Sequence, residues 1–206
     1  KKISSIQTHL DLLPAPAENL SLVAGLPRIS RWTDLRVTTL RELWREAKDA
    51  FDVVIADVGG VLEIDHSLMH ETSLPRRHAT SLTALESAEV TLICARADSV
   101  GIARLVRGYL EFHELFAHSE VHVLLWGVTS DSHSKDVRAA VSRHTGIASI
   151  FETPHNFEIT RKALSQNTFI GKIESKNSIT KKFESISKMI YKNLDLQKQT
   201  QIQTRK

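Results

Sequence analysis

A carboxylate followed by two glycines is the feature of this chain best suited to chemistry. Asp57 ends the apolar run of residues 51–57, and Gly59 and Gly60 follow it almost directly. The β-branched residues before the acid predict a buried strand, and glycines permit a tight turn after it. Ligands of open α/β sheets bind beyond the carboxyl ends of the strands, so Asp57 is placed for phosphate, metal or water chemistry. The alternative is a turn residue whose carboxylate bonds its own backbone.

The partner that such an acid needs in a nucleotide site does not occur in the sequence. No segment matches the phosphate-binding pattern GxxxxGK[ST]. The chain thus presents one half of a nucleotide site without the half that holds the phosphates.

A second set of polar residues includes two His at positions i and i+4. This spacing can bind a transition metal on one face of a helix, although we favour a solvated loop here. The set consists of Asp65, His66, His70 and Glu71.

The composition is that of a globular chain with one core. Apolar residues make up 41% and charged residues 25% of the 206 positions, which excludes a disordered or fibrous protein. The single cysteine, Cys94, excludes an internal disulfide, and its apolar neighbours predict a buried, inert thiol. No apolar run reaches the ~20 residues of a membrane span, and residues 1–5 lack the apolar core of a signal peptide. We therefore expect a cytoplasmic protein. Because the first residue is not Met, we also expect the sequence to begin inside a longer chain.

Positive charge gathers at the carboxyl end. The formal net charge is +3, but from Ser175 onward eight Lys or Arg stand against only Glu184 and Asp195. Such a basic end is suited to contact with nucleic acid or an anionic membrane surface. A solvated helix face with a frayed polar tail is the alternative, and charge runs are usually of that kind.

Apolar runs alternate with helical patterns, which is typical of a parallel sheet with connecting helices. The helical patterns begin near residues 33, 81, 98, 133, 156 and 178. The expected strands are apolar at nearly every position and must be buried on both faces; they are residues 19–24, 51–57, 89–95, 121–128 and 147–151. We expect a three-layer α/β sandwich with a doubly wound, mostly parallel sheet. It forms a single domain over residues 1–195 that is incomplete at its amino end, and residues 196–206 form a polar flexible tail.

In such a sheet the crossover connections bring the strand ends to one edge. Asp57, Arg96, Gly127 and Pro154 are expected along that edge. If the chain has a ligand site, it lies there.

The order of these segments resembles the MinD/ParA group of P-loop ATPases, and in particular its CpaE-like members. The similarity spans residues 20–194. It rests on the strand that ends in Asp57 and on three further segments, residues 85–98, 121–127 and 151–178. The resemblance implies a P-loop NTPase fold and a dimerising ATPase that binds ATP and Mg²⁺. It also implies a role in spatial positioning, such as chromosome partitioning, division-site choice in cell division or pilus assembly.

The resemblance assigns roles to five positions. Asp57 matches the Walker B acid, which holds Mg²⁺ through water or orders the attacking water, and Gly59 and Gly60 match the segment that senses the γ-phosphate. Trp126 stands where many relatives have an Asn that reads the adenine, and Pro154 matches the proline turn after the last strand. An indole can stack on a base but has one donor and no acceptor, so Trp126 cannot read a purine edge as an amide does.

The positions at which the sequence departs from the family determine whether we expect ATP hydrolysis. The amino-terminal phosphate loop and its lysines have no counterpart in residues 1–50, so the chain as given is not expected to hydrolyse ATP. Two interpretations stay open: the carboxyl-terminal part of a positioning ATPase, or a non-hydrolysing scaffold of the same fold. An unrelated doubly wound enzyme is a third. The partners implied are a second copy or a scaffold protein, with the basic end contacting the nucleoid or the inner-membrane surface.

Overall fold

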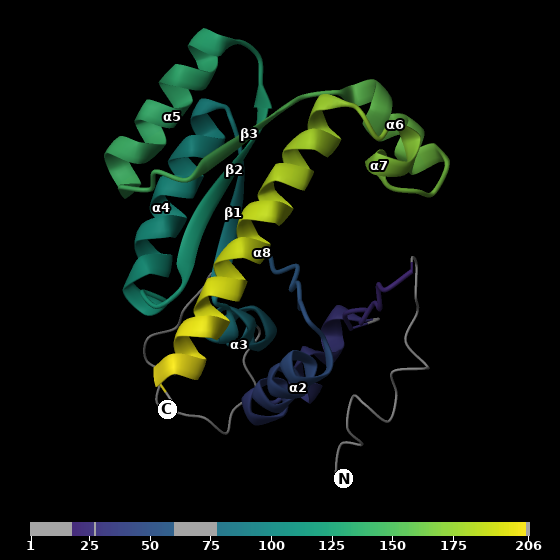
Figure 1. Ribbon diagram of the computed structural model, residues 1–206, viewed down its shortest axis with the longest axis vertical. Coiled ribbons are helices and arrows are strands. Elements are labelled where there is room, and N and C mark those ends of the chain that lie inside the picture. Colours follow the sequence, from purple (N-terminus) through teal and green to yellow (C-terminus); the bar gives the residue numbers. More distant parts are fainter. Residues whose placement is uncertain (1–17, 27, 60–77, 205–206) are drawn as a thin grey trace. The chain divides into compact units, whose positions relative to one another are not determined.

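The computed structural model describes residues 18–26, 28–59 and 78–204, with side chains described up to residue 192 (Figure 1). The chain divides into two compact units, Lys1–Ala88 and Glu89–Lys206. Each unit is described by itself below. The expectation of a single domain over residues 1–195 stays a prediction.

The first unit is helical in its described part. It contains the 3₁₀ helix η2 (Ile29–Asp34), α2 (Val37–Ala50) and α3 (Ala79–Ser87). Val37 and Leu40 of α2 form a small buried cluster with Ala79 of α3. The helices predicted to begin near residues 33 and 81 are therefore confirmed as elements, with boundaries shifted by a few residues.

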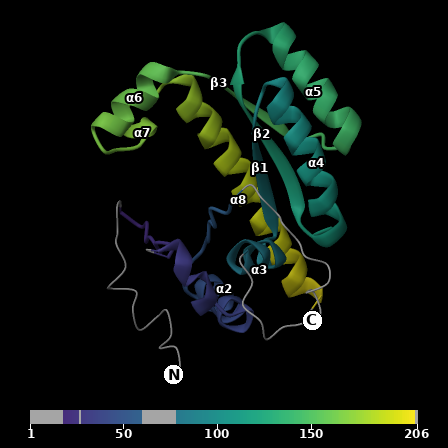
Figure 2. The ribbon, with the colours of Figure 1, turned by 180° about the vertical axis from the view of Figure 1, so that it is seen from behind.

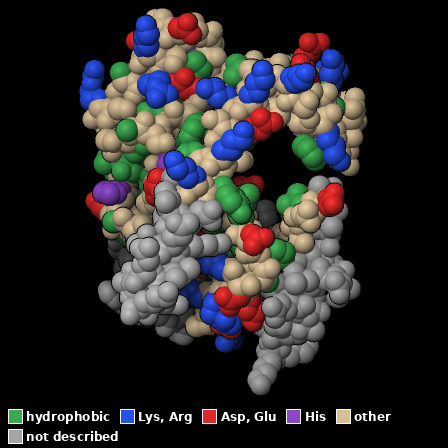
Figure 3. Space-filling view, in the orientation of Figure 1, with side chains coloured by type: hydrophobic (Ala, Val, Ile, Leu, Met, Phe, Trp, Pro, Cys, Tyr) green, Lys and Arg blue, Asp and Glu red, His purple; other side chains and the backbone are tan. Residues whose placement is uncertain are grey.

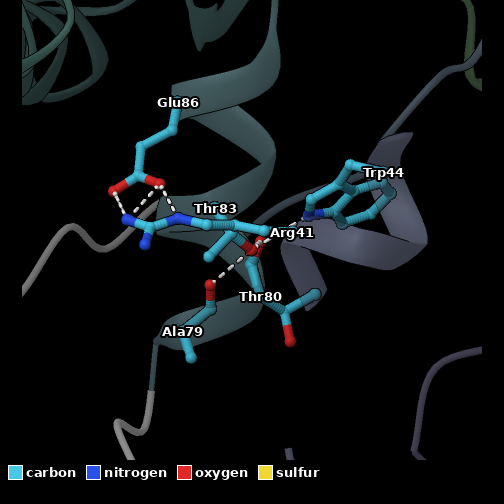
Figure 4. Close-up of polar contacts among 6 residues, drawn as sticks. All are labelled: Arg41, Trp44, Ala79, Thr80, Thr83 and Glu86. Carbon is cyan, nitrogen blue, oxygen red and sulfur yellow. Dashed lines mark hydrogen bonds and ion pairs between the residues drawn. The ribbon is translucent and has the colours of Figure 1, made fainter. Parts of the chain in front are cut away.

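Three polar contacts join α2 to α3, one of which is the hydrogen bond from the Lys48 ammonium to the Ser87 carbonyl oxygen. The indole Nε1 of Trp44 donates to Thr83 Oγ1 at 2.9 Å, and that hydroxyl donates to the Ala79 carbonyl at 2.8 Å (Figure 4). Beside it, the guanidinium of Arg41 meets both carboxylate oxygens of Glu86 at 3.0 and 3.1 Å. Thr83 is buried whereas both members of the ion pair are exposed. The hydrogen bond from Trp44 is therefore expected to stabilise the helix pair more than the ion pair does.

Residues 51–57 do not form a strand, contrary to the prediction. Val53, Val54 and Ile55 are exposed, Ile55 to 88%. The described part of the first unit contains no strand with which they pair. β-branched residues favour a strand only where a neighbouring strand supplies hydrogen bonds and burial. The same reason applies to residues 19–24, where Leu20 forms only an isolated bridge.

The second unit is an α/β structure built on a parallel sheet. Its strands β1 (Val90–Arg96), β2 (Glu120–Val128) and β3 (Ile150–Pro154) pair in the order β1-β2-β3. The crossover helices are α4 (Ser99–Leu115) and α5 (Asp131–Thr145). All five elements were predicted, although β3 begins three residues later than expected. The P-loop NTPase-like form of this fold stays a prediction.

Helices cover both faces of the sheet (Figure 1, Figure 2). On one face, Val123 and Leu125 of β2 are fully buried against Leu105 of α4 and Val141 of α5. Residues alternate between the faces of a strand, so Leu124, which is also buried, lies on the opposite face. That burial on both sides explains the unbroken apolar sequence of β2.

Three helices follow β3: α6 (Phe157–Ser165), α7 (Ile170–Ile173) and α8 (Ser178–Thr204). The last one packs on β3 and buries Ile179 and Ile186, as expected of an amphipathic cover for the sheet. Its backbone is helical to Thr204, through most of the segment predicted to be a flexible tail. None of the helices in the described ranges has the length and apolar content needed to cross a membrane.

Cys94 is exposed, contrary to the prediction that its thiol is buried. β1 is an outer strand of the described sheet, and the two neighbours of Cys94, Ile93 and Ala95, are the residues that pack against the core. Cys94 therefore points to the other face of an outer strand. Apolar sequence neighbours do not report which face of a strand is covered.

His122 is a buried titratable residue on β2. Its Nδ1 lies 2.7 Å from Ser149 Oγ. The imidazole and the ring of Phe151 are arranged edge-to-face, with their centroids 6.2 Å apart. Its Nε2 lies 3.3 Å from a Glu120 carboxylate oxygen, without hydrogen-bond geometry. Burial lowers the pKa of the imidazole, and the Glu120 charge opposes that effect only in part. The folded state therefore favours neutral His122.

We predict that Trp44→Phe weakens the α2–α3 pair by about 1 kcal/mol, because it removes one partly buried hydrogen bond. Hydrogen exchange of the α3 amides measures the local opening free energy. Glu86→Gln, which removes an exposed ion pair, is the matched control and is expected to change it by less than about 0.5 kcal/mol. A larger effect for Glu86→Gln than for Trp44→Phe would contradict the assignment.

We also predict that stability falls at acid pH through His122. The unfolded imidazole takes up its proton near pH 6.5, whereas the folded one does so only at lower pH. Below about pH 6.5 the unfolded state therefore binds more protons and the free energy of unfolding decreases as the pH falls. Urea denaturation at a series of pH values is expected to show a smaller decrease for His122→Asn. His144→Asn, at an exposed histidine, is the control, and an unchanged slope in His122→Asn would refute the role of His122.

Candidate functional site

The carboxyl ends of the three strands meet at one edge of the sheet. Arg96, Trp126 and Thr153 lie side by side there in consecutive strands, and Pro154 pairs with Val128. Of the four residues expected along one edge, Arg96, Gly127 and Pro154 share it, whereas Asp57 belongs to no strand of this sheet. This edge is the place where ligands of open α/β sheets bind, so it is the candidate site of the second unit.

Trp126 contributes a half-buried indole to this edge. Its Nε1 donates to Nδ1 of His155 at 3.2 Å, and the two rings meet at 87° with centroids 6.3 Å apart. Indole has a single hydrogen-bond donor, and His155 already accepts from it. What Trp126 offers a ligand is therefore its aromatic face.

Gly127 introduces an irregularity at the end of β2. Its φ is +90°, and the pairing with β3 shifts register between Trp126 and Val128. A bulge of this kind changes the direction of the side chains that flank it, and bulges are common beside functional sites. A residue with a side chain is strained at such a φ, which explains the glycine.

The turn from β1 to α4 is closed by Asp98. One carboxylate oxygen accepts the backbone N–H of Gly101 at 2.7 Å, and the other accepts the Nε–H of Arg96 at 2.7 Å. The N–H of Gly101 holds the pKa of the Asp98 carboxyl below its ordinary value, and the Arg96 charge lowers it further. Asp98 is therefore an anion fixed at the amino end of α4, where the helix dipole favours negative charge.

Gly101 lets α4 start very close to the end of β1. A Cβ at this position would lie 2.2 Å from the Arg96 carbonyl oxygen. Only glycine permits that approach, much as a glycine permits close helix–strand packing in dinucleotide-binding folds. The sequence interpretation missed this residue. A glycine in the first turn of a helix that directly follows a strand is the signal that would have found it.

The other two helices that begin at this edge are also capped by their own residues. Ser130 Oγ accepts the N–H of His133 at the start of α5, and Asn156 Oδ1 accepts the N–H of Ile159 at the start of α6, both at 3.2 Å. These side chains satisfy backbone donors that an anion would otherwise meet.

His133 ties the end of β1 to the start of α5. Its Nε2 lies 2.7 Å from the Ala97 carbonyl oxygen, and its Nδ1 lies 3.3 Å from the backbone N of Thr129. A backbone N–H can only donate and a carbonyl can only accept, so the neutral ring carries its proton on Nε2. Thr129 Oγ1, 2.9 Å from Nδ1, can donate to the same atom. The imidazole thus fixes the geometry of the edge.

The predicted site residues fall in both units. Trp126 and Pro154 lie together at the edge of the second unit. Asp57 and Gly59 belong to the first unit, where both are exposed and a Cβ on Gly59 would meet open space. Gly60, together with Asp65, His66, His70 and Glu71, lies outside the described residues.

The described edge does not fit a magnesium triphosphate. Such a ligand needs backbone N–H groups and cations around its phosphates and an acid for the metal shell. At the end of β1, the carboxylate of Asp98 caps α4, and the guanidinium of Arg96 is paired with that carboxylate. Asp57 is not a residue of this sheet. Within the ranges that the structure describes, no cluster of three His, Cys, Asp or Glu is suited to hold a metal ion.

Comparisons with known proteins yield no match. No model of a protein family, no curated protein and no solved structure is similar to this chain. The resemblance to the MinD/ParA group therefore rests on the order and spacing of the motifs. The fold itself is established at the level of an α/β structure with a parallel sheet.

We predict that Gly101→Ala destabilises the second unit by about 1–3 kcal/mol, the range for forcing an extra group into a packed site. The new methyl group must displace the backbone of Arg96. Gly108→Ala is the matched control: it lies in the same helix, a Cβ there meets nothing within 4 Å, and Ala is expected to stabilise the helix by about 0.5–1 kcal/mol. Urea denaturation followed by circular dichroism measures both changes. Equal effects of the two substitutions would contradict the close approach.

Proposed function

We propose that this chain is a MinD/ParA/CpaE-like protein of the ATPase family that does not hydrolyse ATP and acts as a scaffold in spatial positioning. Its processes would be chromosome partitioning, division-site choice or pilus assembly in the cytoplasm. The observation that carries the proposal is the state of the carboxyl edge. Three helices begin at that edge of the parallel sheet, and each has its first turn capped by the chain's own Asp98, Ser130 or Asn156.

Electrostatics at α4 supports the absence of hydrolysis. A phosphate that approached this helix end would meet the ionised carboxylate of Asp98, which already binds the N–H of Gly101 and the guanidinium of Arg96. Binding would require the phosphate to displace both interactions in the presence of a like charge. Phosphoryl transfer depends on positioning and charge stabilisation, so a helix start whose nearest acid and cation are already paired with each other has little to contribute to it.

The remaining features of the edge suit recognition rather than turnover. The face of Trp126 and the register shift at Gly127 shape the surface, and the side chain of Arg96 is largely exposed although paired. Aromatic and Arg side chains are enriched in the energetically important parts of protein interfaces. A scaffold that acts through protein contacts, as a homodimer or with another protein, needs these properties and no phosphate cradle.

A nucleotide-binding experiment tests the proposal. We expect no ATP turnover and no shift in the thermal unfolding midpoint of the full natural chain when Mg-ATP is added. A ligand present at a hundredfold excess over its Kd would stabilise the folded state by about 2.7 kcal/mol, so binding would be visible. A clear shift with turnover would contradict the scaffold and indicate an active ATPase.

Asp98→Asn provides the control for the electrostatic argument. Asn caps a helix as well as Asp does but carries no charge. Inorganic phosphate is therefore expected to stabilise Asp98→Asn measurably more than the wild-type chain.

A localisation experiment tests the positioning role. A fluorescent fusion of the chain is expected to concentrate at a pole, the division site or the nucleoid. A uniform distribution through the cytoplasm would contradict that role.

A further inference from the structure

Helix α6 carries apolar side chains on two different sides, one buried and one exposed. Ile159 and Ala163 are buried, whereas Phe157 is 69% exposed and Leu164 is 81% exposed. At about 100° per residue, Phe157 and Leu164 lie about 20° apart on one side of the helix, and this side is centred about 130° from the buried pair. The exposed pair therefore takes no part in packing α6 onto its own unit.

A further exposed aromatic side chain lies just before the short helix α7, which contacts α6. Phe169, the residue before α7, is 55% exposed, and the ammonium of Lys172 lies 5.1 Å from the centre of its ring. α6 and α7 contact each other at one end of the unit, away from the sheet (Figure 1). We call Phe157, Arg161, Leu164, Phe169 and Lys172 the α6–α7 surface.

The charges of the α6–α7 surface are basic. Arg161 lies between Phe157 and Leu164 on the exposed side of α6, since it follows Phe157 by four residues. Lys162 and Lys176 add further exposed positive charge, and only Glu158 and Glu174 oppose it between residues 157 and 176. Lys and Arg side chains gather over these helices next to hydrophobic ones (Figure 3). A ligand that matches this surface presents apolar groups together with carboxylates.

A second copy of the chain is a poor match for the α6–α7 surface. In a two-fold pairing of antiparallel α6 helices, Phe157 would face Leu164 of the other copy. Arg161, midway between them, would then face its own equivalent across the axis. Two guanidinium groups brought together in this way repel each other. The geometry therefore disfavours a homodimer through α6.

A membrane surface is also a poor match. Membrane-surface helices bury a continuous apolar side and keep their basic residues on the polar side. Here Arg161 lies in the middle of the exposed apolar stripe and would be drawn into the hydrocarbon with it. A protein helix, which can place a carboxylate opposite Arg161, avoids that difficulty.

We propose that the α6–α7 surface binds an amphipathic helix of another protein, whose apolar side carries anchors one to two turns apart with an Asp or Glu between them. The anchors would cover Phe157, Leu164 and Phe169, and the carboxylate would pair with Arg161. In this kind of recognition the apolar side of an amphipathic helix packs against an apolar surface of the protein. The proposal gives the scaffold a class of partner but does not depend on the nucleotide fold, because none of its residues lies at the carboxyl edge of the sheet.

The test is a selection from a random library of displayed helical peptides on the immobilised full chain, followed by affinity measurements on synthetic copies of the enriched peptides. We expect the enriched peptides to be apolar and acidic. Leu164→Ser and Arg161→Glu are each expected to weaken binding at least tenfold. Lys181→Glu, at an exposed lysine of α8, is the matched control and is expected to change the affinity less than twofold. Equal circular dichroism melts of all variants confirm that each is folded.

Several results would overturn the proposal. They are peptides without net negative charge, affinities that do not change in Leu164→Ser, or no enrichment over a surface without the chain. Two further arms test the other occupants: sedimentation velocity for self-association, and flotation with vesicles of phosphatidylglycerol and phosphatidylcholine. Either signal, if abolished by Leu164→Ser, would assign the surface to a second copy or to a membrane. Mg-ATP turnover by the same chain would refute the proposed function and leave this surface untouched.

Discussion

The second unit depends on the burial of β2 on both faces. Val123 and Leu125 pack under α4 and α5, while Leu124 is buried on the opposite face. Parallel neighbours cannot be joined by tight turns, so each pairing of β2 requires a crossover that covers the sheet. Those crossovers place the starts of α4 and α5 at the same edge as the ends of the strands. The gathering of polar residues at the carboxyl edge is thus a consequence of burying β2, and it does not by itself imply a ligand.

Close packing at this edge also limits what the edge can bind. Gly101 allows α4 to start against the carbonyl of Arg96, and Asp98 then caps the helix within the same turn. The Asp98 cap stabilises the turn by satisfying the N–H of Gly101, and it thereby makes that donor unavailable to a ligand. A phosphate loop solves the same problem in the opposite way, by leaving backbone N–H groups free for the anion. The local stability of this edge and its capacity for phosphate therefore oppose each other.

The sequence predicted the second unit well because its strands are buried by neighbours that follow at regular intervals. Residues 89–95 and 121–128 carry an apolar signal that burial on the sheet imposes directly. Residues 51–57 carry the same signal, but no strand pairs with them in the described part of their unit. The predicted strand and the placement of Asp57 at its end were therefore wrong. Gly101 was missed because its role depends on a distance between two backbone segments. Cys94 shows that an apolar run does not reveal which face of an outer strand is covered.

Two surfaces of the second unit differ in the free energy that a binding partner can gain by contact with them. At the carboxyl edge the polar groups of Asp98, Ser130 and Asn156 already have partners, so a ligand there exchanges one hydrogen bond for another with little net gain. On α6 the exposed side chains of Phe157 and Leu164 are still in contact with water. Fully burying a side chain of that size contributes about 1.5–3 kcal/mol, and no existing contact has to be broken first. The free energy available for association therefore lies in apolar contact on α6 more than in anion binding at the sheet edge.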